Sequence, residues 1–457
     1  MPLSAHPNRT FELPARVPLV PGVARTRRAA ASALAVLAVA ASAAGCAATS
    51  SGSAAASGGT GSPAPAGASA ASAGSGSTPG SASSPGAAAS SSSSCPSGAA
   101  SAAATSGNGS GQAPALAAVE FVDSGHGWVA GAGRIMATSD GGASWTRQYA
   151  GQADLNQVDF VDGDHGWAAG GGTLLRTTDG GATWTPLAEP CQGELSSLHF
   201  VSPVVGYAVA AAAAPADSPS PGGPYTTATG GTLLRTGDGG ATWSAVTSAP
   251  ANPQSACFAN ADDGYLGTPG RIWRTTDGGG HWTLALTEPA ASGNPTTPAD
   301  TPEIQCAGAT GLWALFLGQG AATGHAPYLA YASQDGRQWH GVLEEQFTES
   351  ALRPGVKLPE GPGSYPGPVS AISAGTAVFV GYTPPLGYGV APVMLASDNG
   401  RALTKEGNVG TIDEPLAAAF LSQDQGWVVG ENLKTNAFSV EATSDAGRSW
   451  RTQYTVG

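Results

Sequence analysis

The chain has 457 residues, of which 67 are Gly, 35 are Pro and 11% are charged, and its formal net charge is −13. Residues 1–45 hold five Arg and one Glu, and residues 46–113 hold no charged residue. This leaves 14 positive and 31 negative side chains, a net of −17, for residues 114–457. An acidic segment of this size can bury a large core, but it lacks the basic patch needed to bind nucleic-acid phosphates or anionic lipid headgroups. We therefore expect no nucleic-acid partner.

Residues 1–45 are expected to be a signal peptide. Arginines up to Arg28 precede the apolar run 29–44. That run is short for a membrane helix, which needs about 20 residues, and it fits the hydrophobic region of an export signal. The run ends in the letters AAGC at Cys46, which resemble the lipobox of bacterial lipoproteins. The resemblance implies lipidation of Cys46 and a place on the outer face of the cytoplasmic membrane, held there only by the lipid anchor. Cleavage followed by secretion is the alternative.

Residues 46–113 are expected to be a disordered linker. They are almost wholly Ala, Ser, Gly, Pro and Thr. Such a composition cannot bury enough apolar surface to offset the entropy lost on ordering. A flexible chain of this length has an end-to-end distance on the order of 45 Å. The linker would therefore hold a following domain clear of a membrane surface.

Seven copies of one pattern make up residues 114–457. The clearest copy reads VDFVDGDHGWAAGGGTLLRTTDGGATW at 158–184. Each copy reads as four short strands joined by turns, with no helical periodicity. Seven such units predict an all-β fold, a seven-bladed β-propeller of four-stranded antiparallel blades. One aspartate marks each copy, and these are Asp140, Asp179, Asp238, Asp277, Asp335, Asp398 and Asp445.

The motif around each aspartate, Ser/Thr-x-Asp-x-Gly-x-x-Trp, resembles the Asp-box (BNR) repeat, and the whole unit is similar to the repeats of the Ycf48/Hcf136-like photosystem II assembly factors. Two copies depart from the motif. Trp339 follows Asp335 one residue early, and Leu403 replaces the Trp after Asp398. Because the aspartate recurs at the same place in every copy, we interpret it as a structural clasp of its hairpin, in preference to a catalytic carboxylate or a calcium ligand.

Long insertions are expected on one face of the propeller. In a four-stranded antiparallel blade, the second-to-third loops and the blade-to-blade loops share a face, opposite the Asp boxes. The insertions at 210–229, 286–302, 318–327, 341–368, 383–390 and 431–438 all fall there. Long loops on a rigid scaffold often carry binding residues. The candidate contacts on this loop face are Tyr225, His325, Tyr328, Glu344, Glu345, Arg353, Tyr365 and Tyr388.

Two further sets of residues recur in neighbouring copies. Arg176, Arg235 and Arg274 stand three residues before their aspartates. Ycf48-like proteins are thought to use an arginine patch, so the resemblance implies an anionic partner, but a solvated strand position is the interpretation we favour. His126 and His165 recur two residues before a Trp, without the further ligands that a metal site needs. We therefore predict no metal site and no cofactor.

The cysteines agree with export to an oxidising compartment. Cys257 and Cys306 fall on the first strands of neighbouring blades, offset by one residue so that their side chains point to opposite sheet faces. Adjacent blades meet through opposite faces, so the offset permits a disulfide between Cys257 and Cys306. The pair Cys191–Cys257 is the alternative.

Two classes of function remain. The first is a non-catalytic, monomeric propeller that binds a protein or a cell-wall polysaccharide through its loop face and serves assembly or scaffolding. The second is a glycoside hydrolase, since some hydrolases also carry Asp boxes, and it would need two loop-face carboxylates about 5 to 9.5 Å apart. The arginine triad of a sialidase is missing from the expected positions: the first Arg after residue 114 is Arg134, followed by Ile135 and Met136. We favour binding over hydrolysis.

Overall fold

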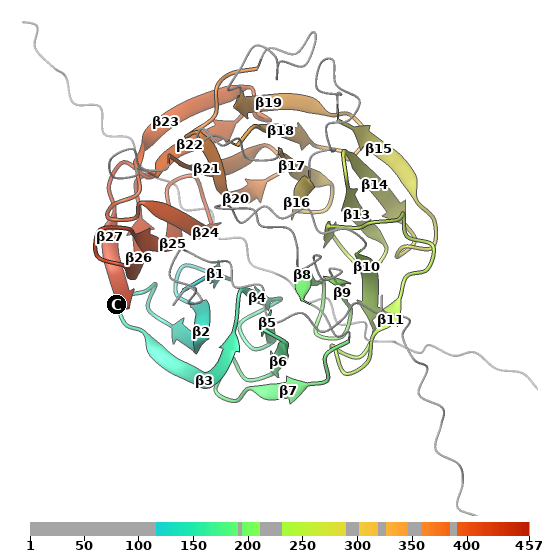
Figure 1. Ribbon diagram of the computed structural model, residues 1–457, viewed down its shortest axis with the longest axis horizontal. Helices are drawn as coiled ribbons and strands as arrows, with labels where there is room; N and C mark the ends of the chain where they lie inside the picture. The colour runs from blue at the N-terminus through green and yellow to red at the C-terminus, as the bar shows by residue number, and fades with distance from the viewer. Residues whose placement is uncertain are drawn as a thin grey trace, which may run out of the picture. The chain divides into compact units, whose positions relative to one another are not determined.

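The computed structural model describes residues 116–190, 194–210, 231–288, 301–318, 326–345, 358–383 and 391–456. These residues form seven antiparallel β-sheets arranged as blades around a central axis (Figure 1). Within these ranges there is no helix, and therefore none long and apolar enough to cross a membrane. The prediction of a seven-bladed β-propeller is confirmed.

Each of the first four blades is one continuous piece of chain. The strands of blades 1 to 4, in chain order, are β1 (Ala118–Phe121), β2 (Gly127–Thr138), β3 (Thr146–Asp154), β4 (Gln157–Phe160), β5 (Gly166–Gly170), β6 (Thr173–Thr177), β7 (Thr185–Leu187), β8 (Leu195–Phe200), β9 (Gly206–Ala210), β10 (Thr232–Thr236), β11 (Ser244–Ala245), β12 (Ser255–Phe258), β13 (Asp263–Thr268), β14 (Arg271–Thr276) and β15 (Thr283–Thr287). In blade 1, β1 pairs with the first part of β2 and β3 pairs with the rest. The single element β2 therefore supplies the second and third strand positions.

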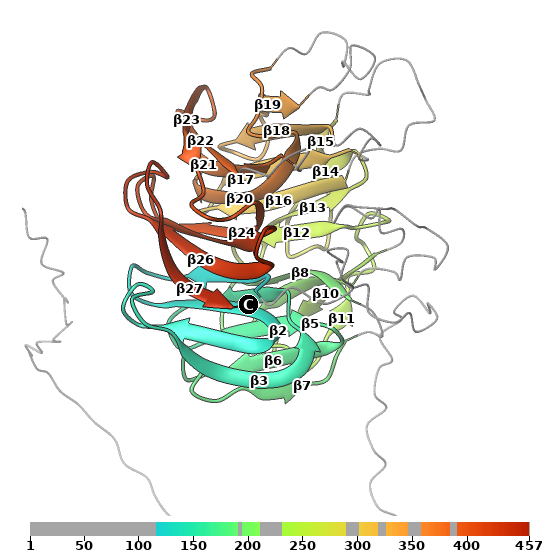
Figure 2. The ribbon, with the colours of Figure 1, turned by 60° about the vertical axis from the view of Figure 1, so that its left-hand side comes forward.

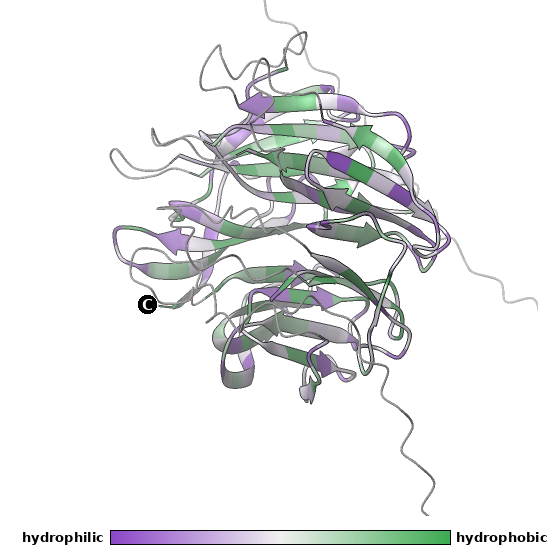
Figure 3. Ribbon diagram, turned by 45° about the vertical axis from the view of Figure 1, so that its right-hand side comes forward, coloured by the Kyte–Doolittle hydropathy of each residue, from purple (hydrophilic) through white to green (hydrophobic). Residues whose placement is uncertain are grey.

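Blades 5 to 7 repeat this plan with longer strands. They are β16 (Thr301–Ala307), β17 (Gly311–Leu317), β18 (Tyr328–Ser333), β19 (His340–Glu345), β20 (Tyr365–Ser373), β21 (Thr376–Tyr382), β22 (Pro392–Ser397), β23 (Ala402–Asn408), β24 (Glu414–Phe420), β25 (Gly426–Asn432), β26 (Ala437–Thr443) and β27 (Arg451–Val456). Green, hydrophobic lengths run along many of the strands, whereas purple lies largely toward strand ends and turns (Figure 3). This distribution is expected for sheets that pack face to face.

The Gly-aromatic pair at the start of most second strands explains how neighbouring blades pack. The glycine leaves room for a phenylalanine of its own blade, because a Cβ at Gly166 would overlap the Phe160 ring. The aromatic residue then stacks on the equivalent phenylalanine of the next blade. Trp167 is fully buried and lies 3.5 Å from the Phe200 ring centroid with the planes 2° apart. This contact between blades is the main apolar feature of the repeat.

Among the strands that the structure describes, none is exchanged between the two ends of the ring. Blade 7 is built from β24 to β27 and blade 1 from β1 to β3, so each blade is made from one segment of chain. Figures 1 and 2 show the red blade 7 beside the cyan blade 1. The two blades meet through a hydrophobic cluster in which Phe121 stacks on Trp427 at 3.5 Å. At the outer rim, Gln453 Nε2 donates to the Gly141 carbonyl oxygen at 2.8 Å.

The strand order places all seven Asp-box turns on one face, because each box joins the third and fourth strand positions of its blade. The strand ends that flank the other connections point to the opposite face. One predicted insertion is wrong. Residues 431–438 do not form a long loop, since β25 and β26 run on to Asn432 and from Ala437 and leave only a tight turn between them. Paired strands account for the extra length.

Candidate functional site

The Asp boxes are structural clasps of their turns. In blade 2, Asp179 Oδ1 accepts hydrogen bonds from the Thr183 N–H and the Thr177 hydroxyl, both at 2.8 Å, and Oδ2 accepts from the Thr183 hydroxyl at 2.7 Å. The Thr177 hydroxyl oxygen also accepts from the Gly181 N–H at 2.8 Å. Hydrogen bonds from the backbone and hydroxyl of Thr183 and from Thr177 lower the pKa of Asp179. A carboxylate that its own turn holds ionised is poorly suited to act as a general acid.

The irregular box of blade 5 keeps the clasp in a shortened form. Asp335 Oδ1 accepts from the N–H groups of Arg337 and Gln338 at 2.8 Å. In the box of blade 6, the Asp398 carbonyl accepts a backbone hydrogen bond from the Arg401 N–H at 3.2 Å, and Asp398 adopts φ 49°. Loss of the motif's spacing or of its Trp thus changes the details of the turn while the hairpin persists.

The recurrent arginines lie against aromatic rings of their own blades. The guanidinium carbon of Arg176 is 5.8 Å from the Trp167 ring, and Arg235 and Tyr207 have the same separation. Arg274 lies 6.0 Å from the Tyr265 ring. All three side chains are partly buried. These cation–π contacts give the arginines a packing role within the blades.

The recurrent histidines each pair with an aspartate three residues earlier in the chain. His126 Nδ1 lies 2.9 Å from Asp123 Oδ2, and His165 Nδ1 lies 3.0 Å from Asp162 Oδ1. Each pair closes a turn on the Asp-box face. Across the residues that the structure describes, no group of three or more His, Cys, Asp or Glu side chains is placed to hold a metal ion.

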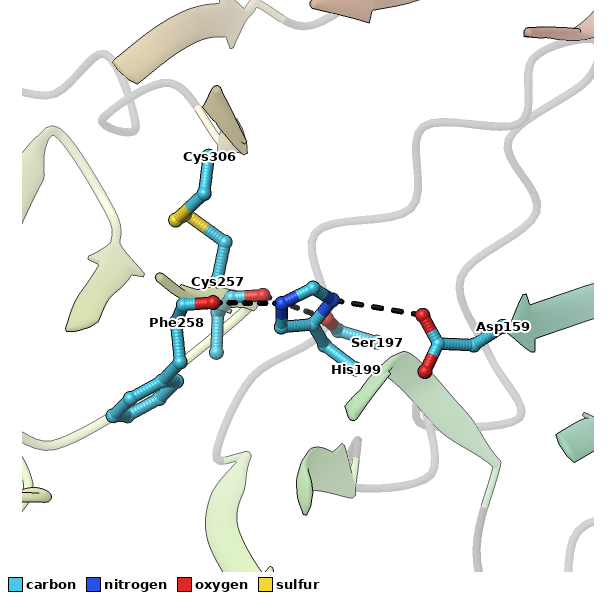
Figure 4. Close-up of a disulfide and its surroundings, with 7 residues drawn as sticks. Asp159, Ser197, His199, Cys257, Phe258 and Cys306 are labelled. Atoms are coloured by element: carbon cyan, nitrogen blue, oxygen red, sulfur yellow. Dashed lines mark hydrogen bonds and ion pairs between the residues drawn. A yellow bond between two sulfur atoms is a disulfide. The ribbon is translucent and has the colours of Figure 1, made fainter. Parts of the chain in front are cut away.

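Polar side chains of the innermost strands join neighbouring blades near the axis. Asp159 Oδ2 in blade 2 accepts from the Phe200 N–H in blade 3 at 2.6 Å. His199 Nε2 in blade 3 lies 2.8 Å from the Phe258 carbonyl oxygen in blade 4, as Figure 4 shows. Cys257 and Cys306 then form a disulfide between blades 4 and 5, with Cα atoms 5.7 Å apart. The structure thus has the pairing that the strand offset favoured, and not Cys191–Cys257.

The same inner ring holds a carboxylate whose ionisation is disfavoured. Burial, and then the nearby charge of Asp159, raise the pKa of Glu120 well above its usual value, although the Phe160 N–H donates to its Oε2 at 2.8 Å. Burial opposes protonation of His199, but the hydrogen bond and charge of Asp159 and the Phe258 carbonyl outweigh it and raise its pKa. Both groups therefore bind protons more tightly in the folded state than in the unfolded state.

This arrangement predicts that the protein is more stable in mild acid than in mild alkali. Stability falls as pH rises from Glu120's ordinary value of 4.5 through its raised folded pKa, and falls again as pH passes the raised folded pKa of His199. We expect the melting temperature at pH 5 to exceed that at pH 8, and Glu120→Gln to shrink the difference. The exposed Asp424→Asn is the control. An unchanged difference in Glu120→Gln would contradict the assignment.

Four of the eight loop-face candidates fall within the described residues. Tyr328, Glu344, Glu345 and Tyr365 all lie at the strand ends of blades 5 and 6 that point to the loop face. Tyr225, His325, Arg353 and Tyr388 lie outside the described residues, as does the lipidation candidate Cys46. The four described residues come from three strands, β18, β19 and β20, and the fold gathers them at one junction between blades.

A pocket of about 540 Å³ opens at this junction. Its walls are the end of β19, the segment 360–364, the residues at Thr383 and Pro392, and the end of β23. Three carboxylates line it, those of Glu345, Glu360 and Glu406, together with one ammonium, that of Lys405. No aromatic side chain is among its described lining residues. The pocket is therefore polar and carries more negative than positive charge.

Two of the predicted contact residues do not line this pocket but hold one of its walls in place. Glu344 is 6% exposed, and its Oε1 accepts from the Leu358 N–H at 2.9 Å while its backbone bonds to Pro359 and Gly361. Tyr328 is 2% exposed, with its hydroxyl 3.2 Å from the Pro362 carbonyl oxygen. Both therefore hold residues 358–364, which we call the strap, against the edge of blade 5. Of the four described candidates, only Glu345 lines the pocket itself.

A second acidic cluster lies nearby, where blades 6 and 7 reach the loop face. Glu414 and Glu431 are opposite each other on β24 and β25. Burial, and then the charge of Glu431, raise the pKa of Glu414, and burial raises the pKa of Glu431. Burial and these carboxylates also raise the pKa of Tyr382, whose ring is 5.8 Å from that of Tyr365.

Sequence reasoning missed two of the charged pocket residues, Lys405 and Glu406, and it noted Glu360 only as one of several loop-face carboxylates. They follow no repeat position, and they come together only because the strap folds back between two blades. The one available signal was the pair Lys405 and Glu406 near the end of a fourth strand, where charges are common on exposed edges. Glu406 is instead nearly buried, at 4% side-chain exposure, and lies 3.0 Å from the Arg448 guanidinium of blade 7.

Residues 111–197 match the family model of the photosynthesis system II assembly factor YCF48. The chain is an Asp-box β-propeller similar to the YCF48 family. No curated protein matches it. Among solved structures, YCF48 bound to a D1 peptide is 18% identical, with 70% of this chain and 94% of that chain covered and a TM-score of 0.43.

Glycoside hydrolases also share the fold. The GH74 enzyme of Niastella koreensis is 14% identical, with 74% of this chain and 53% of that chain covered and a TM-score of 0.52. The GH74 xyloglucanase of Xanthomonas campestris is 12% identical, with 74% and 54% covered and a TM-score of 0.50. This chain therefore spans about half the length of these enzymes. Likeness at such identities is a likeness of fold, which hosts many functions.

Proposed function

We propose that this protein is an exported, lipid-anchored and non-catalytic propeller that binds a protein partner through its loop face and serves the assembly or scaffolding of other proteins. The observation that carries the proposal is the polar pocket between blades 5 and 6, placed on the face opposite the Asp-box clasps. The similarity of residues 111–197 to an assembly-factor family supports a protein as the partner. The disulfide between Cys257 and Cys306 supports an oxidising location outside the cytoplasm.

The charge of the pocket favours a basic segment of the partner. Glu345 and Glu406 are nearly buried, whereas Glu360 is exposed at the rim. Glu406 already pairs with Arg448, so a lysine or arginine side chain entering this space would chiefly meet the exposed Glu360 and the strap. The lining also argues against a polysaccharide, because sugar sites commonly use an aromatic ring as a stacking platform and this lining has none among the described residues.

Charge reversal at the rim tests the proposal. Intact cells carrying the full chain would be crosslinked, and the partners captured with the wild-type protein would be compared with those captured with Glu360→Lys. We expect about a tenfold or greater loss of the partner from Glu360→Lys, because a like charge now faces the basic segment. Glu194→Lys is the matched control, since it makes the same exposed charge change on the connection between blades 2 and 3. Equal capture by both variants would refute binding at this pocket.

Export and anchoring are tested separately at the lipobox. We expect Cys46→Ser to move the protein from the membrane fraction to the soluble exported fraction and to remove labelling by a fatty-acid analogue. Cys95→Ser in the linker should change neither property. Retention of Cys46→Ser on the membrane would contradict lipid anchoring and leave the binding proposal to its own experiment.

Hydrolysis is a second candidate, favoured by one observation. The facing carboxylates Glu414 and Glu431 both have raised pKa values, as a general acid requires. Turnover of aryl glycosides or polysaccharides that disappears in Glu414→Gln would establish this activity. Its absence over a broad panel would leave the binding function as the better account.

A further inference from the structure

One residue position on the innermost strand of each blade forms a belt around the axis. In six blades it is the residue that pairs with the Trp or Tyr near the start of the second strand, and in blade 6 it is the residue that pairs with Val378. In chain order the seven belt residues are Glu120, Asp159, His199, Cys257, Gln305, Ser370 and Ala419. The belt is thus defined by register and not by similar chemistry.

Six of the seven belt residues bond to the following blade. Glu120, Asp159 and His199 do so by hydrogen bonds of 2.8, 2.6 and 2.8 Å to the backbone of Phe160, Phe200 and Phe258. Gln305 bonds to the backbone of blade 6 at Val369 and Ala371, at 2.7 and 3.0 Å. Ser370 Oγ accepts from the Phe420 N–H at 2.9 Å. Cys257 differs from the others because its link, to Cys306, is covalent.

The seventh belt residue cannot make such a link. Ala419 has only a methyl group, and it faces the junction between blades 7 and 1, which we call the seam. The seam is also the junction that no connecting segment of chain bridges, because β24–β27 and β1–β3 lie at opposite ends of the described sequence. Its contacts include the Phe121–Trp427 stack within a hydrophobic cluster of both blades, the Trp145–Tyr454 ring contact and the Gln453 bond at the rim, but no belt residue links the two blades.

The disulfide stands on the far side of the ring from the seam. Four blades separate them in one direction, blades 1 to 4, and three in the other, blades 5 to 7. Without the disulfide, the belt would be interrupted at two places, and blades 4 and 5 would keep the Ser255 hydroxyl bond to the Pro302 carbonyl at 2.6 Å. Cys257 is 4% exposed, whereas Cys306 is only partly buried. Cys306 is therefore the more exposed residue of the pair.

We propose that the Cys257–Cys306 disulfide is a redox-sensitive crosslink. By fixing blade 4 to blade 5, it keeps the ring closed at the seam on the opposite side. A dithiol reductant attacks one sulfur and breaks the S–S bond. Its second thiol then closes the reductant's own disulfide, so that two electrons pass to the cysteines and each becomes a thiol. Two junctions then lack a belt link, that between blades 4 and 5 and the seam. Blades 1–4 rotate relative to blades 5–7 about the junction between blades 4 and 5, and the two groups of blades separate at the seam. Local opening of this kind needs only the two junctions that then lack a belt link to part.

Hydrogen exchange of the full chain, oxidised and after treatment with dithiothreitol, tests this device. We expect reduction to speed amide exchange about tenfold or more in β1 and β24 at the seam and in β12 and β16 beside the disulfide. Exchange in β5 and β6 of blade 2 should stay unchanged. A rise of equal size in all blades, or one confined to β12 and β16, would overturn the proposal.

Two variants distinguish a specific effect of the disulfide on the seam from a general loss of stability. The double variant Cys257→Ser with Cys306→Ser should exchange like the reduced protein and no longer respond to dithiothreitol. A response that persists would overturn the assignment, because it would have to come from another cysteine. Ala419→Ser supplies the hydroxyl that Ser370 uses at the same position in blade 6. In reduced protein it should slow exchange in β1 and β24 but not in β12 and β16, and failure to do so would also reject the model.

Discussion

Replacing Trp167 by alanine is expected to lower the free energy of unfolding by about 3–5 kcal/mol, the usual cost of removing a fully buried tryptophan. Trp167 is 0% exposed, stacks on Phe200 of the next blade, and donates from Nε1 to the Gly239 carbonyl oxygen at 3.0 Å. The substitution removes the apolar contact between blades 2 and 3 and leaves that carbonyl without its donor. Urea unfolding followed by circular dichroism measures the loss.

Two control variants show how much of the expected loss at Trp167 comes from the hydrogen bond and how much from the stacked position. Trp167→Phe keeps a ring against Phe200 but removes the N–H, so we expect a loss of about 1–2 kcal/mol, the range for one buried hydrogen bond and its desolvation. Trp184→Ala removes a box tryptophan that is only partly buried and meets Phe160 edge-on at 5.9 Å. We expect a smaller loss there than at Trp167. If Trp184→Ala costs as much as Trp167→Ala, the stacked position is not the principal contact between blades.

Replacing Gly381 by alanine is expected to remove the loop-face pocket. Gly381 lies on β21 where the strap passes, and a Cβ there would overlap the Pro362 carbonyl oxygen. The strap must move, because its backbone cannot yield as a flexible side chain would. Overpacking of this kind costs about 1–3 kcal/mol. We expect capture of the partner to fall about tenfold or more, since a shift of 1 Å or so in a binding surface disrupts its contacts.

The matched control is Gly163→Ala, at a turn where an added Cβ meets no atom within 4 Å. It should leave both unfolding and partner capture unchanged. Normal partner capture by Gly381→Ala, with an unfolding free energy reduced as expected, would show that the strap and its pocket do not form the binding surface. A loss of capture by both variants would instead point to a general effect on the protein.

The fold was predictable because its determinants repeat. The Asp-box motif forms the same hairpin turn in most blades, and the Gly-aromatic pair forms the same contact with the next blade. Because both motifs recur along the sequence, the fold could be predicted even where a single strand was ambiguous. The register of the repeats permitted the Cys257–Cys306 disulfide through the one-residue offset, but it left Cys191–Cys257 open as the alternative. The departures fall where repetition stops. The insertion expected at 431–438 is instead an extended hairpin, which an irregular sequence does not distinguish from a loop.

The pocket was less predictable for a physical reason. Its charged residues come from the end of β19, the strap and the end of β23, which have no fixed relation in the repeat. Their meeting depends on a single fold-back of chain that Tyr328 and Glu344 hold in place. Sequence reasoning identified Tyr328 and Glu344 as notable, because they are polar residues near a long connection. It assigned them to ligand contact, whereas the structure gives both a supporting place behind the pocket.

The construction of each blade from one unbroken stretch of chain has an evolutionary consequence. In-frame duplication or deletion of the DNA for one blade would add or remove a complete sheet and leave no surviving strand without its neighbours. In a propeller that is closed by a sheet with strands from both ends of the chain, such changes would be less well tolerated, because the strands from the two ends would still have to pair with each other. We therefore expect duplication or deletion of a whole blade to be tolerated better than that of part of a blade, and an added blade between blades 7 and 1 would interrupt no connection between described blades.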